Sequence, residues 1–296
     1  APADQQTAER AKIETQGWGG QLFKLQDHNG LWAGGAFLPA GFTEERWRLE
    51  GQPWTATCWT ITQLREFGLL PTCESARRTM RLIHEHARWE HDNEPYWQGE
   101  VEECINGRTV ADGAYFGVDV SPIVAGLLEM QQPDGGWNCQ RANGSRVSSF
   151  DSTINVLEGL LEYEQHAGPS PQIKEARQRG QEYLLRRHLF RRLTTGEAAD
   201  PQYLKLTYPN YWRHDILRGL DYFRKASWWD HTPPDPRLSQ AIELLESKRL
   251  PDGRWAMDWE LRGQRWLHFD TGPVQPSRWI TLRALRVLKW WDASRK

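Results

Sequence analysis

The 296-residue sequence lacks the features that define several large classes of protein. No uninterrupted apolar run approaches the roughly 18 residues that a membrane-spanning helix needs, so we expect no transmembrane span. Basic and acidic residues nearly balance, with 37 Lys plus Arg, 39 Asp plus Glu and a net charge of −2. This balance gives no electrostatic reason to expect nucleic acid or an anionic membrane surface as a partner.

Cysteine is scarce, and its spacing excludes two common sites. Cys58, Cys73, Cys104 and Cys139 are far apart and form no CxxC motif, which argues against a zinc ribbon or a thioredoxin-type site. Free thiols are typical of a reducing compartment, and no secretory signal is visible, so we expect a cytoplasmic protein. The chain begins at Ala1 rather than at methionine, which is consistent with removal of an earlier segment.

Tryptophan, in contrast, is abundant, with 17 residues. Large rings fill cores, but this number also suggests an aromatic-lined cavity. One tryptophan-containing turn occurs three times, as "KLQDHNGLWAGG" at 24–35, "QQPDGGWNCQ" at 131–140 and "KRLPDGRWAMD" at 248–258. A turn that is used three times indicates a structural rather than a catalytic role.

A helical segment recurs five times and predicts an all-α fold. The segments are "TITQLREFG" (60–68), "TVADGAYFG" (109–117), "VLEGLLEYE" (156–164), "ILRGLDYFR" (216–224) and "TLRALRVLK" (281–289). Amphipathic stretches such as 121–131 precede them. We therefore predict one domain over residues 1–296, built from helical hairpins at about 18–70, 71–118, 119–167, 172–226 and 235–294.

Such hairpins cannot bury their apolar faces alone, so they should stack and could close into an α/α toroid with inner and outer helices. Small residues in the recurring segments suit a crowded inner ring, namely Gly113, Gly159, Gly219 and Ala284. The Asp-Gly pair of each turn is expected to end the outer helix, because glycine tolerates a left-handed C-cap. Serines or an aspartate in 148–153, and Ser277, are expected to cap inner helices.

The stretch "QQPDGGW", with its connector and the helix "FDSTINVLEGLLEY", resembles the QW repeat of squalene–hopene and oxidosqualene cyclases. The whole chain resembles one α/α toroid domain of the terpenoid cyclase and protein prenyltransferase β-subunit superfamily. The resemblance implies that Gln131 or Gln132 caps the adjacent helix and that Trp137 stacks on a neighbouring element. It gives Trp255 the same role in the last repeat.

The sequence also departs from this superfamily. Lys248 or Arg249 stands where the last repeat would have its glutamine, which implies a weaker tie. Class II cyclases protonate an alkene with an aspartate of a DxDD or DCTAE motif, and neither motif occurs here. Protein prenyltransferases need an α-subunit and a zinc ion held by Asp, Cys and His. The resemblance therefore implies the fold and a cyclase-like enzyme that works without the DxDD motif.

In an α/α toroid the inner helices direct their N-termini toward one mouth, where the local field favours anions. The residues that enter these helices are the candidates for catalysis. The predicted catalytic residues are His214, Asp151, Cys104, Asp215 and Glu103. Histidine titrates near neutral pH, and a thiol is activated by a helix N-terminus and a positive neighbour such as Arg108. The alternatives are a structural histidine and a buried, inert thiol.

The predicted substrate-binding residues are mainly aromatic. They are Trp54, Cys58, Trp59, Arg108, Phe150, Asn155, Tyr208, Tyr211, Trp212, Arg278 and Trp279. Aromatic walls bind apolar or aromatic ligands and stabilise cations through their ring faces. Arg278 is expected to bind a carboxylate or phosphate.

No cofactor is expected, although Glu102, Cys104, Asp151 and His214 form a weak candidate set for zinc. The leading hypothesis is acid–base chemistry of the lyase, isomerase or cyclase type on a small apolar or aromatic substrate with a polar or anionic handle. One alternative is a carbohydrate-active α/α barrel, which needs two facing carboxylates. The others are zinc-dependent prenyl transfer and a non-catalytic ligand-binding module, which predicts a shallow or plugged centre.

Overall fold

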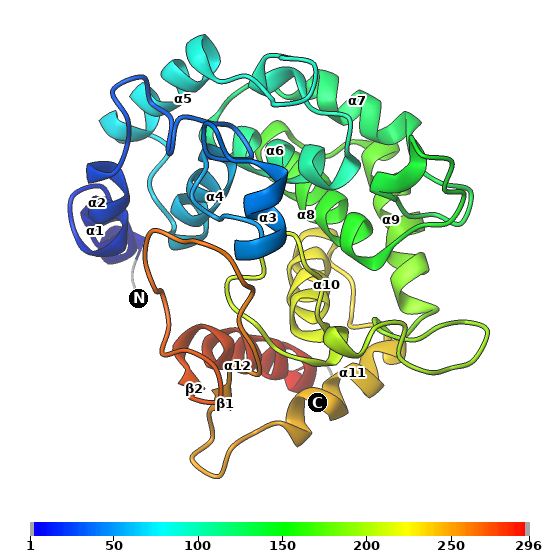
Figure 1. The fold of residues 1–296 in the computed structure, drawn as a ribbon. Coiled ribbons are helices and arrows are strands. Elements are labelled where there is room, and N and C mark those ends of the chain that lie inside the picture. Colours follow the sequence, from blue (N-terminus) through cyan, green and yellow to red (C-terminus); the bar gives the residue numbers. More distant parts are fainter. Residues whose placement is uncertain (1–2, 294–296) are drawn as a thin grey trace.

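The computed structural model describes residues 3–293, and this part of the chain is all-α, as predicted (Figure 1). The α-helices are α1 (Ala3–Lys12), α2 (Gly17–Lys24), α3 (Glu44–Glu50), α4 (Thr57–Phe67), α5 (Glu74–His86), α6 (Glu103–Phe116), α7 (Ser121–Glu129), α8 (Phe150–Ala167), α9 (Pro171–Leu185), α10 (Ile216–Asp230), α11 (Ser239–Ser247) and α12 (Arg278–Ala293). Short 3-10 turns lie at Tyr96–Gln98, Cys139–Arg141, Pro201–Leu204 and Pro236–Leu238. The two-residue strands β1 (Trp255–Ala256) and β2 (Pro276–Ser277) pair antiparallel.

The helices that contain the recurring segments lie toward the middle of the molecule. In Figure 1, α5, α7, α9 and α11 lie outside α4, α6, α8, α10 and α12. The middle helices contact one another in chain order, α4 with α6, α6 with α8, α8 with α10 and α10 with α12. An ion pair of 3.2 Å between Arg283 of α12 and Glu66 of α4 joins the last of them to the first.

The closest of these contacts, between α6 and α8, depends on glycine. A Cβ atom on Gly159 would lie 2.2 Å from the carbonyl oxygen of Gly107, and one on Gly107 would lie 2.5 Å from the carbonyl oxygen of Asn155. Any side chain larger than hydrogen would therefore push the two backbones apart. Gly159 is one of the small residues that the sequence placed in the inner helices, and Gly107 is a second that the pattern did not single out.

The turn that contains Trp137 connects the end of one helix to the start of the next. The indole N–H of Trp137 donates to the carbonyl of Leu127 in the last turn of α7, at 2.7 Å. Its backbone N–H donates to the hydroxyl of Thr153 in the first turn of α8, at 3.1 Å. One residue thus satisfies an otherwise unpaired carbonyl at a helix end and fixes the next helix against it.

Both bonds recur in the two related turns. The indole N–H groups of Trp32 and Trp255 donate to Leu22 and Leu245 at 2.8 and 2.7 Å, and their backbone N–H groups donate to Thr57 and Thr281. We call this pair of bonds the tryptophan tie. Its three copies connect α2 to α4, α7 to α8 and α11 to α12. The structural role that repetition predicted for this turn is therefore confirmed.

The glutamine before the turn binds the neighbouring outer helix. Gln131 donates from Nε2 to the carbonyl of Gly135, at 2.7 Å, and to that of Ala176 in α9, at 2.8 Å. Gln26 makes the equivalent bonds to Gly30 and to the Thr79 hydroxyl of α5, both at 2.9 Å. Gln131, rather than Gln132, therefore occupies the repeated position.

In the last repeat, Arg249 holds this position. It makes only the bond within the turn, from Nε to the carbonyl of Gly253, at 3.3 Å. Its guanidinium packs over the Trp255 ring, 5.3 Å from the centroid. Arg249 thus supports its own turn without the bond to a further outer helix that the two glutamines make.

The expectation that the Asp-Gly pair ends the outer helix is wrong. Helix α7 ends at Glu129, and Gly135 lies beyond it in the turn with a φ of +100°. Its N–H donates to the carbonyl of Gln132, so glycine shapes the turn after the helix has already ended. The expected serine caps are confirmed, because Ser149 accepts from the Ser152 N–H and Ser277 from the Ile280 N–H.

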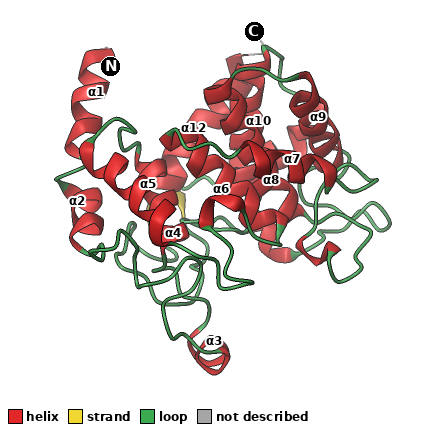
Figure 2. Ribbon diagram, turned by 90° about the horizontal axis from the view of Figure 1, so that it is seen from above, coloured by secondary structure: helices red, strands yellow, loops and turns green. Residues whose placement is uncertain are grey.

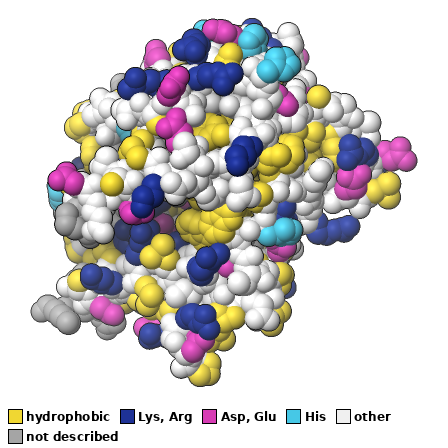
Figure 3. Space-filling model, turned by 90° about the vertical axis from the view of Figure 1, so that its left-hand side faces the viewer, with side chains coloured by type: hydrophobic (Ala, Val, Ile, Leu, Met, Phe, Trp, Pro, Cys, Tyr) yellow, Lys and Arg dark blue, Asp and Glu magenta, His cyan; other side chains and the backbone are white. Residues whose placement is uncertain are grey.

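The connectors and the surface charges are distributed differently over the molecule. The long connectors gather on one side of the molecule, and α3 projects from them (Figure 2). Over the face in Figure 3, Lys and Arg side chains are interspersed with Asp and Glu rather than separated from them. In the described part of the chain, no helix combines the length and the apolar character that crossing a membrane requires.

Replacing Trp137 with Phe tests the tryptophan tie. The ring is retained, but the carbonyl of Leu127 loses its buried donor, which costs about 1–3 kcal/mol. We expect urea unfolding to show this decrease in the free energy of unfolding. The control is Trp228→Phe, because Trp228 is 72% exposed. Equal effects of the two substitutions would show that the tie does not stabilise the fold.

Candidate functional site

A cavity of about 350 Å³ lies where the middle helices α6 and α8 begin. The lining side chains come from the first two turns of α6, from the first turn of α8, from α3 and α4 and from the long connectors. They are Phe37, Trp47, Gln52, Trp59, Glu102, Cys104, Ile105, Arg108, Asn138, Cys139, Gln140, Ser149, Asp151, Ser152 and Trp212. The cavity therefore combines aromatic rings, thiols, carboxyl groups and a buried cation.

Several residues predicted from the sequence meet in this cavity. Cys104 and Asp151 come from the predicted catalytic set, and Trp59, Arg108 and Trp212 come from the predicted substrate-binding set. All five lie in, or next to, the first turns of the middle helices, where the sequence placed the site.

Arg108 is a buried cation without a carboxylate partner. Its guanidinium donates to the carbonyl of Tyr211 at 2.6 Å and to the hydroxyl of Thr62 at 3.0 Å, and it lies 4.8 Å from the Trp59 ring centroid. None of the ion pairs within the described residues includes it. Asp112, one turn further along α6, is bonded to Arg65 and Thr62 instead. Burial lowers the pKa of Arg108, although a guanidinium stays protonated at neutral pH.

Asp151 is held rigidly at the cavity wall. Its Oδ1 accepts the backbone N–H of His214 at 2.6 Å, and its Oδ2 accepts the Tyr203 hydroxyl at 3.2 Å. Burial raises the pKa of Asp151 above its ordinary value, and these two bonds only partly oppose that effect. The carboxyl group therefore keeps its proton to higher pH than an exposed aspartate and can act as a proton donor.

His214 and Asp215 do not line the cavity. The His214 ring donates from Nε2 to the carbonyl of Leu189 at 2.7 Å and packs on Phe150, and only 2% of the residue is exposed. Asp215 is the N-cap of α10, where its carboxylate accepts the N–H of Arg218. These bonds are structural, and they agree with the alternative that His214 is a structural histidine.

Glu103 and Asn155 also do not line the cavity, and their polar groups are bonded to other parts of the protein. Glu103 is buried, and its Oε1 accepts from Arg141 at 2.7 Å. Asn155 donates from Nδ2 to the carbonyls of Asp151 and Trp212, both at 2.7 Å. Asn155 thus connects α8 to the connector that carries Trp212, and it positions cavity residues without facing the cavity itself.

The remaining predicted binding residues lie in the core or in a second aromatic group. Trp54 stacks on Tyr211 with centroids 4.0 Å apart, Phe150 packs on His214, and Cys58 is buried in the core. Tyr208 stacks on Trp279, which belongs to a group with Trp18, Phe67 and Phe269. Arg278 is exposed and lies over the Trp18 ring, so it does not supply a cation to the cavity.

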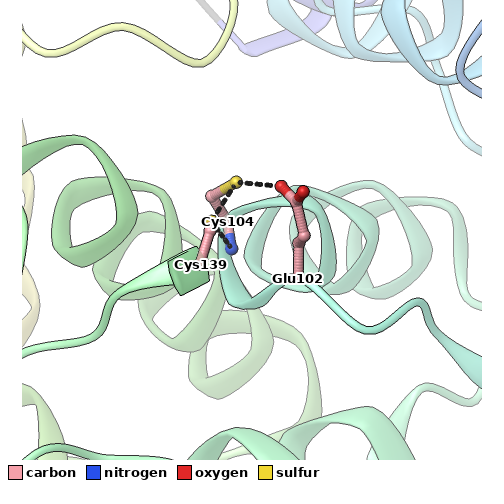
Figure 4. A group of neighbouring side chains, drawn as sticks. All are labelled: Glu102, Cys104 and Cys139. Atoms are coloured by element: carbon pink, nitrogen blue, oxygen red, sulfur yellow. Dashed lines mark hydrogen bonds between the residues drawn. The ribbon is translucent and has the colours of Figure 1, made fainter. Parts of the chain in front are cut away.

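The cavity also contains a residue that the sequence patterns left without a role. Cys139 lies two residues beyond Trp137, and its Sγ is 2.6 Å from the Sγ of Cys104 (Figure 4). The two thiols and the carboxylate of Glu102 place their ligand atoms within 4.8 Å of one another. In the candidate zinc set, Cys139 thus takes the place of Asp151 and His214, which are not part of this group. In the sequence, the only feature that could have pointed to Cys139 was its position directly after a repeated structural turn.

The centre of the molecule is filled with paired charges. Arg65 of α4 contacts Asp112 of α6 at 2.7 Å, and Arg218 of α10 contacts Glu158 of α8 at 2.7 Å. A separate pocket of about 60 Å³ is lined by Arg65, Glu158 and Arg218 among others. It shares no lining residue with the cavity at the helix N-termini.

The chain matches no known protein-family model, and the search of curated proteins found no match. The functional interpretation therefore depends on the geometry of this cavity.

The burial of His214 predicts a pH dependence of stability. Burial lowers its pKa from 6.5 to about 4, so the unfolded chain binds a proton at pH 5 that the folded chain does not bind. Stability is therefore expected to fall as the pH decreases from about 6.5 to 4, by roughly 3 kcal/mol from this group. In His214→Gln, urea unfolding at a series of pH values should show a smaller decrease. Parallel curves for the two proteins would contradict this assignment.

Proposed function

We propose that the chain is an α/α toroid enzyme that acts on a small apolar or aromatic molecule with an anionic group, in the cavity at the start of α6 and α8. The contacts of the middle helices in chain order, and the ion pair between Arg283 and Glu66, support a closed ring of inner helices. The tryptophan ties join the two helices of a hairpin, and Gln26 and Gln131 bind the outer helix of the next hairpin, which supports the resemblance to the terpenoid cyclase superfamily.

Arg108 is the group proposed to bind the anionic part of the substrate. A buried charge without a partner costs several kcal/mol, whereas the other arginines of the centre are paired with carboxylates. An anion in the cavity would supply the missing partner. The first turns of α6 and α8 add the positive ends of two helix dipoles on the same side.

Trp59 and Trp212 are proposed to bind the apolar part, and Asp151 to transfer the proton. The cavity volume of about 350 Å³ is at the small end of the range for ligand sites, roughly 300–1,000 Å³. This size favours a small substrate over a triterpene. Asp151 is the cavity carboxyl group whose burial favours the protonated form, so it suits the role of general acid.

The observation that carries the proposal is that one cavity contains a buried arginine without an ion pair among the described residues, a partly buried carboxyl group and the three tryptophan rings of Trp47, Trp59 and Trp212. A cavity with these groups binds an anionic aromatic ligand and donates a proton to it. No part of this proposal uses a DxDD motif, and the acid comes from the helix that follows the tryptophan turn.

The role of Arg108 is tested with 8-anilino-1-naphthalenesulfonate, which combines aromatic rings with one anionic group. Arg108→Met should weaken binding about 10- to 100-fold, as expected for loss of a hydrogen bond to a charged group. Arg108→Lys should retain more of the affinity because it keeps the charge. Arg278→Met is the matched control and should bind like the wild type. Fluorescence titration measures the affinity, and near-ultraviolet circular dichroism checks the fold. Equal affinity in all four proteins would refute the anion site.

The role of Asp151 is tested with geranyl diphosphate, a short apolar chain with an anionic group. We expect the wild type to form a product that mass spectrometry detects, and Asp151→Asn to form it about 100-fold more slowly or worse. The asparagine can still accept the His214 N–H, so the fold should persist. The wild-type rate should fall as rising pH removes the proton from Asp151. No product from the wild type, or equal rates, would contradict the proposed reaction.

A further inference from the structure

The thiols of Cys104 and Cys139 converge on the carboxylate of Glu102 at the cavity wall (Figure 4). Glu102 precedes α6, Cys104 lies in its first turn, and Cys139 begins the 3-10 turn after Trp137. The Sγ of Cys104 is 3.6 Å from Oε2 of Glu102 and 2.6 Å from the Sγ of Cys139. Two separate segments of the chain therefore place three metal-ligand groups together.

The carboxylate of Glu102 lacks a basic partner. Among the described residues it forms no ion pair, and the neighbouring Arg141 is bonded to Glu103 instead. A partly buried carboxylate beside two thiols, one of which donates to it, is a site of negative potential that a cation would offset. A disulfide between the two cysteines would leave this carboxylate without a partner.

The sulfur of Cys139 is held by donors on both sides. It accepts the backbone N–H of Cys104 at 3.4 Å and the hydroxyl of Ser152 at 3.2 Å. Ser152 in turn accepts the backbone N–H of Cys139 at 3.1 Å and the hydroxyl of Ser149 at 2.9 Å. Hydrogen bonds to a sulfur from surrounding groups are typical of thiolates that bind metals, since they orient the ligand.

We infer that Glu102, Cys104 and Cys139 form a binding site for one thiophilic divalent cation, of which zinc is the best match. Thiolate and carboxylate ligands suit zinc, and three protein ligands leave a fourth position open. That position faces the cavity, where water or a group of the ligand fills it. Binding requires the two sulfurs to separate to about 3.8 Å, because zinc–sulfur bonds of about 2.3 Å are arranged tetrahedrally.

This site goes beyond the proposed function, because it requires no particular substrate and no role for Arg108 or Asp151. A bound cation would balance the charge of two thiolates and a carboxylate on one wall. It would also fix the tryptophan turn, through Cys139, to the first turn of α6, through Cys104.

The test is a titration of the reduced, metal-free full chain with Co²⁺. The wild type should bind a single ion and develop the visible bands of tetrahedral Co²⁺ with a thiolate-to-cobalt charge-transfer band. Zn²⁺ should displace it. Cys139→Ser should weaken the charge-transfer band and lower the affinity about tenfold or more, and Glu102→Gln should lower the affinity with the band retained. Cys73→Ser is the matched control, because Cys73 lies at the start of α5 and outside the cavity.

Absence of these bands from the reduced wild type, or an unchanged spectrum in Cys139→Ser, would overturn the inference. A Cys104–Cys139 disulfide found by peptide mass spectrometry, in a protein that binds no Co²⁺ after reduction, would overturn it in favour of a redox pair. Binding of the anionic naphthalene probe is measured on metal-free protein, so the metal site and the proposed function fail independently.

Discussion

The rest of the structure depends on the bond between a tryptophan indole N–H and the last turn of the preceding helix. The carbonyls at a helix C-terminus have no partner within the helix, and burying them unpaired is costly. Trp137 supplies the donor for Leu127, and its own backbone N–H holds Thr153 at the start of α8. One buried residue therefore sets both the end of one helix and the start of the next, and the three copies repeat this geometry around the molecule.

The same bond also determines where the chemistry lies. Since the ring of Trp137 is buried and its backbone is bonded to α8, the residues that follow it emerge at the N-terminal ends of the middle helices. Cys139, two residues further, therefore reaches the cavity and contacts Cys104. The turn that repetition marked as structural thus also places a thiol in the cavity, and Cys139 becomes part of the candidate site.

The repeated pattern predicted the helical class, the tryptophan turn and its position between helices, because spacing and periodicity are local properties. It also predicted the side of the molecule where Cys104, Asp151 and Trp212 meet. It did not predict which polar groups would be bonded to the backbone. His214 was expected in the site, but the carbonyl of Leu189, 25 residues earlier in the chain, accepts its N–H. The sequence could not show that Arg108, and not Arg278, lies in the cavity without a carboxylate partner, because such contacts are made between distant segments of the chain.

Charge pairing distinguishes Arg108 from the arginines of the centre. Arg65, Arg218 and Arg283 each contact a carboxylate on a neighbouring middle helix. Arg108 lies at the boundary of this paired region, and the nearest acid of its own helix, Asp112, is already bonded to Arg65 and Thr62. Asp112 still raises the pKa of Arg108 electrostatically, but it forms its ion pair with Arg65, and Arg108 has none among the described residues. If Arg108 binds an anion as proposed, a substitution that freed Asp112 from Arg65 would weaken that binding without changing the cavity lining.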